Sequence, residues 1–70
     1  MVEKIIDLTG SSSTSIEDAV SLAVARAAVT ISGIYHVEIT DISAVVEDGM
    51  VTRWKVQIKA TFPVKDRIHE

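Results

Sequence analysis

Few side chains of this sequence have the chemistry to form a site, and His36 is the first of them. It lies in the segment GIYHVEIT, residues 33–40, where apolar and polar residues alternate from Tyr35 on and place His36 on the same side as Glu38. Such alternation is typical of a strand with one side in water. A histidine and a carboxylate at this spacing could hold a metal ion, but two ligands without a third make a weak site. The sequence contains no cysteine, so we expect no structural zinc site.

Three further residues are candidates for binding a ligand. Lys55 and Gln57 alternate with apolar residues in the last apolar segment, and this spacing predicts that they share one face of a strand. Arg26 is the one charged residue between Asp18 and Glu38. An arginine in such an apolar stretch pairs with a carboxylate or lies at an interface more often than it binds a phosphate. No serine, histidine and acid are spaced as a catalytic set, so we do not expect an enzyme.

The composition limits the possible partners. The chain has 70 residues, a formal net charge of −3 and 47% hydrophobic residues. A negative charge without a basic stripe argues against nucleic acid as a partner, and no run of about 18 apolar residues is present that would cross a membrane. No signal peptide is recognisable at the start, so a cytoplasmic location is the default expectation. We expect residues 1–70 to form a single domain.

The first half of the chain predicts a strand and a helix. Residues 2–9 are predicted as a short strand, and the sequence GSSS that follows is typical of a turn. Thr14 and Glu17 have the spacing of a capping box. They predict a helix over residues 15–32 that ends at Gly33, a residue suited to a helix C-terminus.

The predicted helix is apolar on nearly every side. Between residues 19 and 31 the only polar residues are Ser21, Arg26 and Thr30. One small sheet covers one side of a helix, so the other side needs a neighbour to leave water. We therefore expect the chain to associate with copies of itself.

The second half of the chain predicts two strands joined by a tight turn. Residues 35–46 form the first strand, in which the alternation slips by one residue. The slip predicts either a bulge near Asp41 or a strand covered on both faces. Asp48 and Gly49 suit a two-residue type I′ turn. Residues 51–64 then alternate as the second strand.

A two-residue turn fixes the pairing of these two strands. The predicted cross-strand pairs are His36 with Thr61, Glu38 with Lys59, Ile39 with Ile58 and Thr40 with Gln57. Opposite charges then face each other, and so do apolar groups, which supports the register. The predicted fold class is α+β, in the order β-α-β-β, with a three-stranded antiparallel sheet wrapped around one helix.

Several stretches of the sequence together resemble the dodecin family. The resemblance extends from Lys4 to about Phe62 and is carried by KIIDLTGSSSTSIEDAV, by ARAAVT, by an EDG hairpin and by a final VQIKATF. It implies the β-α-β-β fold, assembly into a hollow homododecamer and a function without enzymatic activity. It also implies binding of flavins such as FMN or riboflavin as stacked pairs at symmetry axes, for storage or for quenching of their photochemistry.

The resemblance implies roles for two residues, and both depart from the family pattern. His36 occupies the position that resembles a tryptophan stacked on the flavin ring, and Lys55 occupies the position that resembles a glutamine bonded to the ring edge. Imidazole offers less stacking area than indole. A lysine donates hydrogen bonds but cannot accept them, whereas an amide does both. Both changes weaken the flavin contacts that the resemblance implies.

The sequence thus predicts a dodecin-like, non-enzymatic homo-oligomer that binds or stores a small planar ligand, with flavin as the leading candidate. The candidate binding residues are His36, Lys55, Arg26 and Gln57. The alternative is a structural or cation-binding assembly that has lost flavin and uses carboxylates such as Glu38 or Asp41. Neither a nucleic acid nor a membrane is an expected partner.

Overall fold

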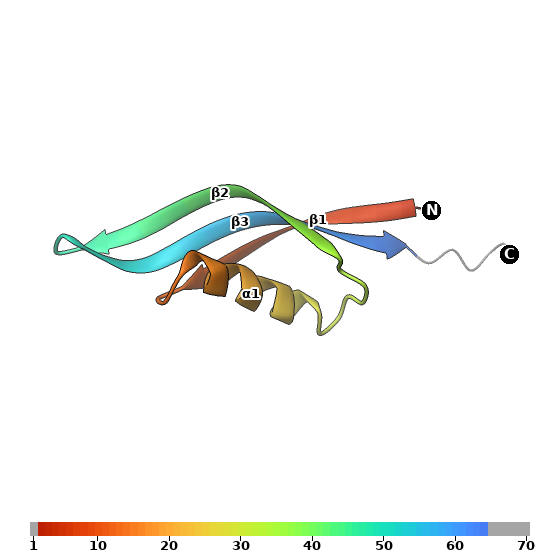
Figure 1. The fold of residues 1–70 in the computed structure, drawn as a ribbon, viewed down its shortest axis with the longest axis horizontal. Coiled ribbons are helices and arrows are strands. Elements are labelled where there is room, and N and C mark those ends of the chain that lie inside the picture. Colours follow the sequence, from red (N-terminus) through yellow and green to blue (C-terminus); the bar gives the residue numbers. More distant parts are fainter. Residues whose placement is uncertain (1, 65–70) are drawn as a thin grey trace, which may run out of the picture.

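Four elements follow one another in the order β-α-β-β, as predicted (Figure 1). The structure is a computed structural model and describes residues 2–64. The elements are β1 (Val2–Ser12), α1 (Ile16–Ala27), β2 (His36–Glu47) and β3 (Met50–Val64). The sheet is antiparallel with β3 in the centre, between β1 and β2. The helix lies on one face of this sheet, mainly against β1 and β3, so the predicted fold class is confirmed.

The first strand is longer than predicted, because the glycine and two of the serines of GSSS belong to it rather than to a turn. Gly10 pairs with Val56 where β1 passes α1. A Cβ added at Gly10 would collide with the backbone carbonyl oxygen of Ala19 and crowd the Ala23 side chain. A glycine inside a strand often marks such a close approach. Gly10 therefore allows β1 and α1 to pack closely.

The helix begins one residue later than the predicted capping box. Ser15 is the N-cap, and its hydroxyl accepts a hydrogen bond of 3.0 Å from the backbone N–H of Asp18. The Asp18 carboxylate instead accepts a bond of 2.6 Å from the hydroxyl of Ser12, whose oxygen accepts from the N–H of Thr14. The prediction of Thr14 and Glu17 as the capping pair is wrong, because β1 continues through Ser12 and moves the start of the helix along the chain.

The helix also ends earlier than predicted, at Ala27 rather than near Ser32. The backbone N–H of Val29 bonds to the carbonyl three residues before it, as does that of Thr30, and this tightens the chain into turns after the helix. Val29 is 80% exposed, so no packing holds a further helical turn on the sheet. Gly33 has the positive φ of 85° expected of it, but it lies in the connection to β2 and not at the helix end.

The turn between β2 and β3 has the predicted geometry. Asp48 has a φ of 53° and Gly49 a φ of 77°. A type I′ turn requires positive φ at both central residues, and its twist matches the twist of the two strands. Glu47 pairs with Met50, directly at the turn.

Two β-bulges shift the register in the middle of the hairpin and cancel each other. Thr52 is the extra residue on β3, near the turn, and Thr40 is the extra residue on β2, further along. Each threonine hydroxyl donates to a carbonyl oxygen of the other strand, Thr40 to Gln57 at 3.1 Å and Thr52 to Val45 at 3.4 Å. Through these bonds each bulged threonine stays connected to the neighbouring strand by its side chain, at a point where the regular pairing of the backbones is interrupted.

The predicted register is therefore correct at both ends of the hairpin and wrong between the bulges. The confirmed pairs are His36 with Thr61, Glu38 with Lys59 and Ile39 with Ile58. The predicted pair of Thr40 with Gln57 is wrong, because Asp41 pairs with Gln57 and Thr40 is the bulged residue. Of the two explanations predicted for the slip in alternation, the bulge near Asp41 is confirmed.

The core lies between α1 and the central strand. Its buried apolar residues are Ala19, Ala23 and Ala27 of the helix and Val56, Ile58 and Ala60 of β3. Alanines bring the helix axis close to the sheet, because their side chains add little thickness. The helix stays apolar on its outer side as well, since Leu22 is 49% exposed and Ala25 is exposed.

We predict that Gly10→Ala lowers the free energy of unfolding by about 1–3 kcal/mol, the range for overpacking a close contact. The added methyl must push against the Ala19 backbone, which has no rotamer to change. Denaturant titration at one fixed protomer concentration measures the loss. Thr9→Ala, at an exposed position on the other face of the same strand, is the matched control and should change stability by less than about 0.5 kcal/mol. Equal stability of Gly10→Ala and the parent would contradict the close approach.

We predict that Gly49→Val lowers the free energy of unfolding by about 1–2 kcal/mol, because a β-branched residue tolerates positive φ poorly. A Cβ at Gly49 meets no atom within 4 Å, so crowding makes no contribution and the loss reports the backbone alone. Gly49→Asn should lose less, since asparagine visits the left-handed region. A melting temperature equal to that of the parent for Gly49→Val would contradict the turn geometry.

Candidate functional site

The sheet face turned away from α1 carries polar side chains from all three strands, and we call it the polar face. Because Thr40 is the extra residue of a bulge, Asp41 takes the place opposite Gln57. The bulge thus keeps the polar residues of the second half of β2 on the polar face. Its polar residues include Asp7, Thr9 and Ser11 of β1, Lys55, Gln57 and Lys59 of β3, and His36, Glu38, Asp41 and Ser43 of β2.

A shallow hollow of about 300 Å³ lies on the polar face. It is lined by Thr9, Asp41, Ser43, Lys55, Val56 and Gln57. It brings together two of the four predicted binding residues, Lys55 and Gln57. The ammonium donates, the carboxylate accepts, and the amide and the hydroxyls do both. The hollow can therefore hydrogen-bond the polar edge of a small ligand.

His36 lies on the same face but not in this hollow. It pairs with Thr61, whereas Lys55 pairs with Ser43. Thr61 and Lys55 are six residues apart on β3, which at about 3.3 Å per residue is about 20 Å along the strand. Within one protomer, His36 and Lys55 are thus too far apart to contact one small planar ligand.

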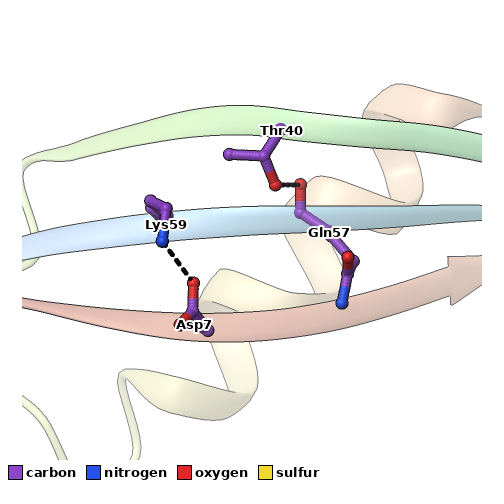
Figure 2. A network of polar contacts seen from close by, with 4 residues as sticks. All are labelled: Asp7, Thr40, Gln57 and Lys59. Atoms are coloured by element: carbon purple, nitrogen blue, oxygen red, sulfur yellow. Dashed lines mark hydrogen bonds and ion pairs between the residues drawn. The ribbon is translucent and has the colours of Figure 1, made fainter.

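The charges between these two positions are partly paired (Figure 2). The Lys59 ammonium lies 3.0 Å from a carboxylate oxygen of Asp7. Both side chains are largely in water, at 47% and 76% exposed, so the pair adds little to stability. The backbone oxygen of Gln57 is held by Thr40, while in Figure 2 the Gln57 side chain extends toward β1. The hydrogen bond with Thr40 therefore does not occupy the side-chain amide of Gln57, which can bind a ligand in the hollow.

The fourth predicted residue, Arg26, lies in the other layer of the fold. It lines a groove of about 520 Å³ between α1 and β1, on the far side of the sheet from Lys55. The structure therefore separates the four predicted residues into three places: Lys55 with Gln57 in the hollow, His36 further along the polar face, and Arg26 in the groove.

A comparison with protein families decides the identity of the fold. The family model described as Dodecin matches residues 2–65. The chain belongs to the dodecin family. Among curated proteins no sequence matches it.

Solved structures of dodecins agree with this assignment. A dodecin from Streptomyces coelicolor is 29% identical to this chain, with a TM-score of 0.88 and 93% of each chain covered. A protein from Thermus thermophilus is 26% identical, with a TM-score of 0.88, covering 93% of this chain and 96% of that one. The calcium dodecin of Mycobacterium tuberculosis, a calcium-chelating antigen with a novel calcium-binding site, is 26% identical, with a TM-score of 0.80 and 96% of each chain covered.

The hollow offers hydrogen-bonding groups, but among residues 2–64 no aromatic side chain lines it. Trp54 and Phe62 alternate with the polar-face residues of β3 and so belong to the face turned toward α1. The described part of one protomer therefore places no aromatic ring in the hollow on which a planar ligand could stack.

Within residues 2–64 no three His, Asp or Glu side chains gather closely enough to hold a metal ion together. In the same part of the chain, no helix has the length and hydropathy needed to cross a membrane.

Sequence reasoning did not include Thr9, Ser43 or Asp41 among the residues of this hollow. Ser43 and Asp41 were missed because the predicted register ignored the shift between the bulges, which sets them opposite Lys55 and Gln57. Thr9 was missed because the pairing of β1 with β3 has no tight turn to fix it, although β1 also alternates in this region.

Proposed function

We propose that this dodecin is a non-enzymatic, cytoplasmic homo-oligomer, a dodecamer by family resemblance, which holds a small planar ligand on its polar face. The observation that carries the proposal is the hollow around Lys55 and Gln57, which offers hydrogen bonds but no stacking group in its own protomer. The missing aromatic surface then comes from His36 of another copy. Assembly and ligand binding are thus two parts of one function.

Assembly is supported by the apolar surface that one protomer leaves in water. The helix packs mainly against β1 and β3, and β2 contributes Val37 to this packing. The large apolar residues of the hairpin that stay exposed on the same sheet face are Ile39, Ile42, Val46 and Val51, while Met50 is exposed on the other face beside the turn. Exposed apolar residues gathered on one face of so small a chain are typical of a protein interface.

We predict that light scattering after size exclusion gives a mass of about 90 kDa, as expected for twelve copies of a 7.6 kDa chain. Burial of the exposed apolar residues provides the free energy of association. A single species with the mass of one chain at micromolar concentration would refute the proposed assembly.

Flavin is the leading ligand because the family resemblance implies it and because two features of this chain fit it in part. Lys55 and Gln57 can donate to the carbonyl oxygens of a flavin ring edge, and Gln57 can also accept. His36 is an exposed aromatic side chain on the same face. Imidazole is a poorer stacking partner than indole, so we expect weak binding by the parent.

We predict that His36→Trp combined with Lys55→Gln strengthens flavin binding by about tenfold to a thousandfold. The indole adds on the order of 1 kcal/mol of stacking, and a better-matched amide adds about 1–3 kcal/mol. Titration of flavin fluorescence against protein measures the affinity of both proteins.

The matched control is His36→Trp combined with Lys59→Gln, which makes the same chemical changes on the same face but leaves Lys55 in the hollow. This control should gain only the stacking part. Equal gains in the two double variants would show that Lys55 does not contact the ligand, and no gain in either would refute flavin as the ligand.

A cation is the second candidate ligand, because Asp41 lines the same hollow with three neutral oxygen-bearing side chains, those of Thr9, Ser43 and Gln57. Ca²⁺ takes six to eight oxygen ligands, so waters would have to complete its shell. The similarity to a calcium dodecin favours testing this ion. Calorimetric titration with Ca²⁺, compared with Asp41→Asn, distinguishes the two ligands: heat that disappears in the variant supports the cation and counts against flavin in this hollow.

A further inference from the structure

The groove between α1 and β1 is a second place where one protomer is incomplete. It has a volume of about 520 Å³ and is lined by Leu8, Thr9, Gly10, Ser11, Leu22, Ala23, Arg26 and Ala27. Its helix side is apolar apart from Arg26, and Leu22 is 49% exposed. Its strand side is β1, an outer strand of the sheet, and within residues 2–64 no strand pairs with the far edge of β1.

Arg26 is the charged residue among those that line this groove. Within residues 2–64 no carboxylate lines the groove, and no Asp or Glu lies within 4 Å of the guanidinium. An arginine is well suited to pair with a carboxylate across an interface, because its fork of donors matches the two oxygens. A partner for this groove should therefore combine an apolar surface with an acidic end.

The same chain carries a segment with this combination. The end of the β2–β3 hairpin, residues 44–54, projects past α1 (Figure 1), and we call it the hairpin arm. Val46 and Val51 pair on its α1-facing side, and they are 60% and 48% exposed. Met50 is 69% exposed, and the turn beside it carries Glu47 and Asp48. The arm is thus apolar along one side and acidic at its tip.

We propose that the hairpin arm of one copy docks in the α1–β1 groove of the next copy, with the acidic turn paired to Arg26. The apolar side of the arm covers Leu22 and the helix alanines, and Glu47 and Asp48 supply the carboxylates that Arg26 lacks. This inference rests on the proposed homo-oligomer and names the surfaces that form it. It gives Arg26 an assembly role instead of the ligand-binding role predicted from the sequence.

The contact has a consequence for symmetry. Groove and arm are different surfaces of the same chain. Each copy therefore binds the arm of one neighbour in its groove and inserts its own arm into the groove of another neighbour. Such a heterologous contact closes into a ring when the rotation between copies allows it. A two-fold pair would instead bring identical surfaces together.

A charge exchange tests the proposal. Arg26→Glu faces the acidic turn with a third carboxylate and should reduce the mass seen by light scattering. The turn variant Glu47→Lys with Asp48→Asn should do the same by facing Arg26 with a lysine. Asparagine at position 48 keeps a residue that tolerates the positive φ there. Combining all three substitutions restores opposite charges and should restore the parental mass.

The control is Lys59→Glu, which makes the same change of charge on the polar face, outside both the arm and the groove, and should leave the mass unchanged. If Arg26→Glu keeps the parental mass, or if the combined variant fails to regain it while circular dichroism shows a folded chain, the docking is wrong. If the parent itself is a monomer, the proposed homo-oligomer fails and the docking fails with it.

Cross-linking tests the same contact without relying on charge. The natural chain has no cysteine, so introduced thiols are the only ones present. Arg26→Cys and Glu47→Cys chains, refolded together and oxidised, should give covalent dimers that contain one chain of each kind. Each variant oxidised alone should give few. Dimers that form equally well within one variant would overturn the heterologous contact.

Discussion

The structure depends on keeping one face of β3 apolar and one face polar along its whole length. Alternate residues of this strand are buried under α1, and the residues between them point to the polar face. A shift of one residue in a neighbouring strand would exchange the faces of that strand. The hairpin nevertheless contains two extra residues. They do not break the pattern because one lies on each strand, so each bulge corrects the displacement made by the other.

This arrangement explains which parts of the fold could be predicted. The turn at Asp48 and Gly49 was predicted because its two residue types suit positive φ. The slip in alternation near Asp41 revealed one bulge. The bulge at Thr52 was not predicted. Its mark in the sequence is the pair of successive polar residues Thr52 and Arg53, which lies so close to the turn that the alternation has only begun there. The predicted pairs between the bulges were wrong for that reason.

The errors around the helix have a different origin. GSSS is typical of a turn by composition, but Gly10 is required where β1 meets the Ala19 backbone, which is a tertiary contact. The sequence from Ala28 to Ile31 is apolar apart from Thr30 and so extended the predicted helix. In the fold Ala28, Val29 and Thr30 are exposed, and turns replace the helix. Local pattern cannot distinguish apolar residues that pack inside one chain from those that are left for an interface.

The candidate site shows a similar limit of local sequence pattern, here in the distance between residues that share one face. Strand alternation placed His36, Lys55 and Gln57 on one face correctly, but it gave no separation along the strand. The pairing positions supply that separation, and they divide the residues between a hollow and a point about 20 Å away. Arg26 was predicted as a binding residue because it is a lone charge in an apolar stretch. Its position in the groove between α1 and β1 could not be predicted from composition.

The position of Trp54 has a spectroscopic consequence. It is the only tryptophan of the chain, it is half-buried, and it pairs with Ala44 at the base of the hairpin arm, on the face away from the hollow. Indole emission depends on the polarity around the ring, so docking of the arm on a neighbouring copy, as proposed above, would change the emission of Trp54. This residue would then serve as an intrinsic optical reporter of that contact. A ligand seated on the opposite face of the sheet would alter that emission only by energy transfer through the sheet, without direct contact.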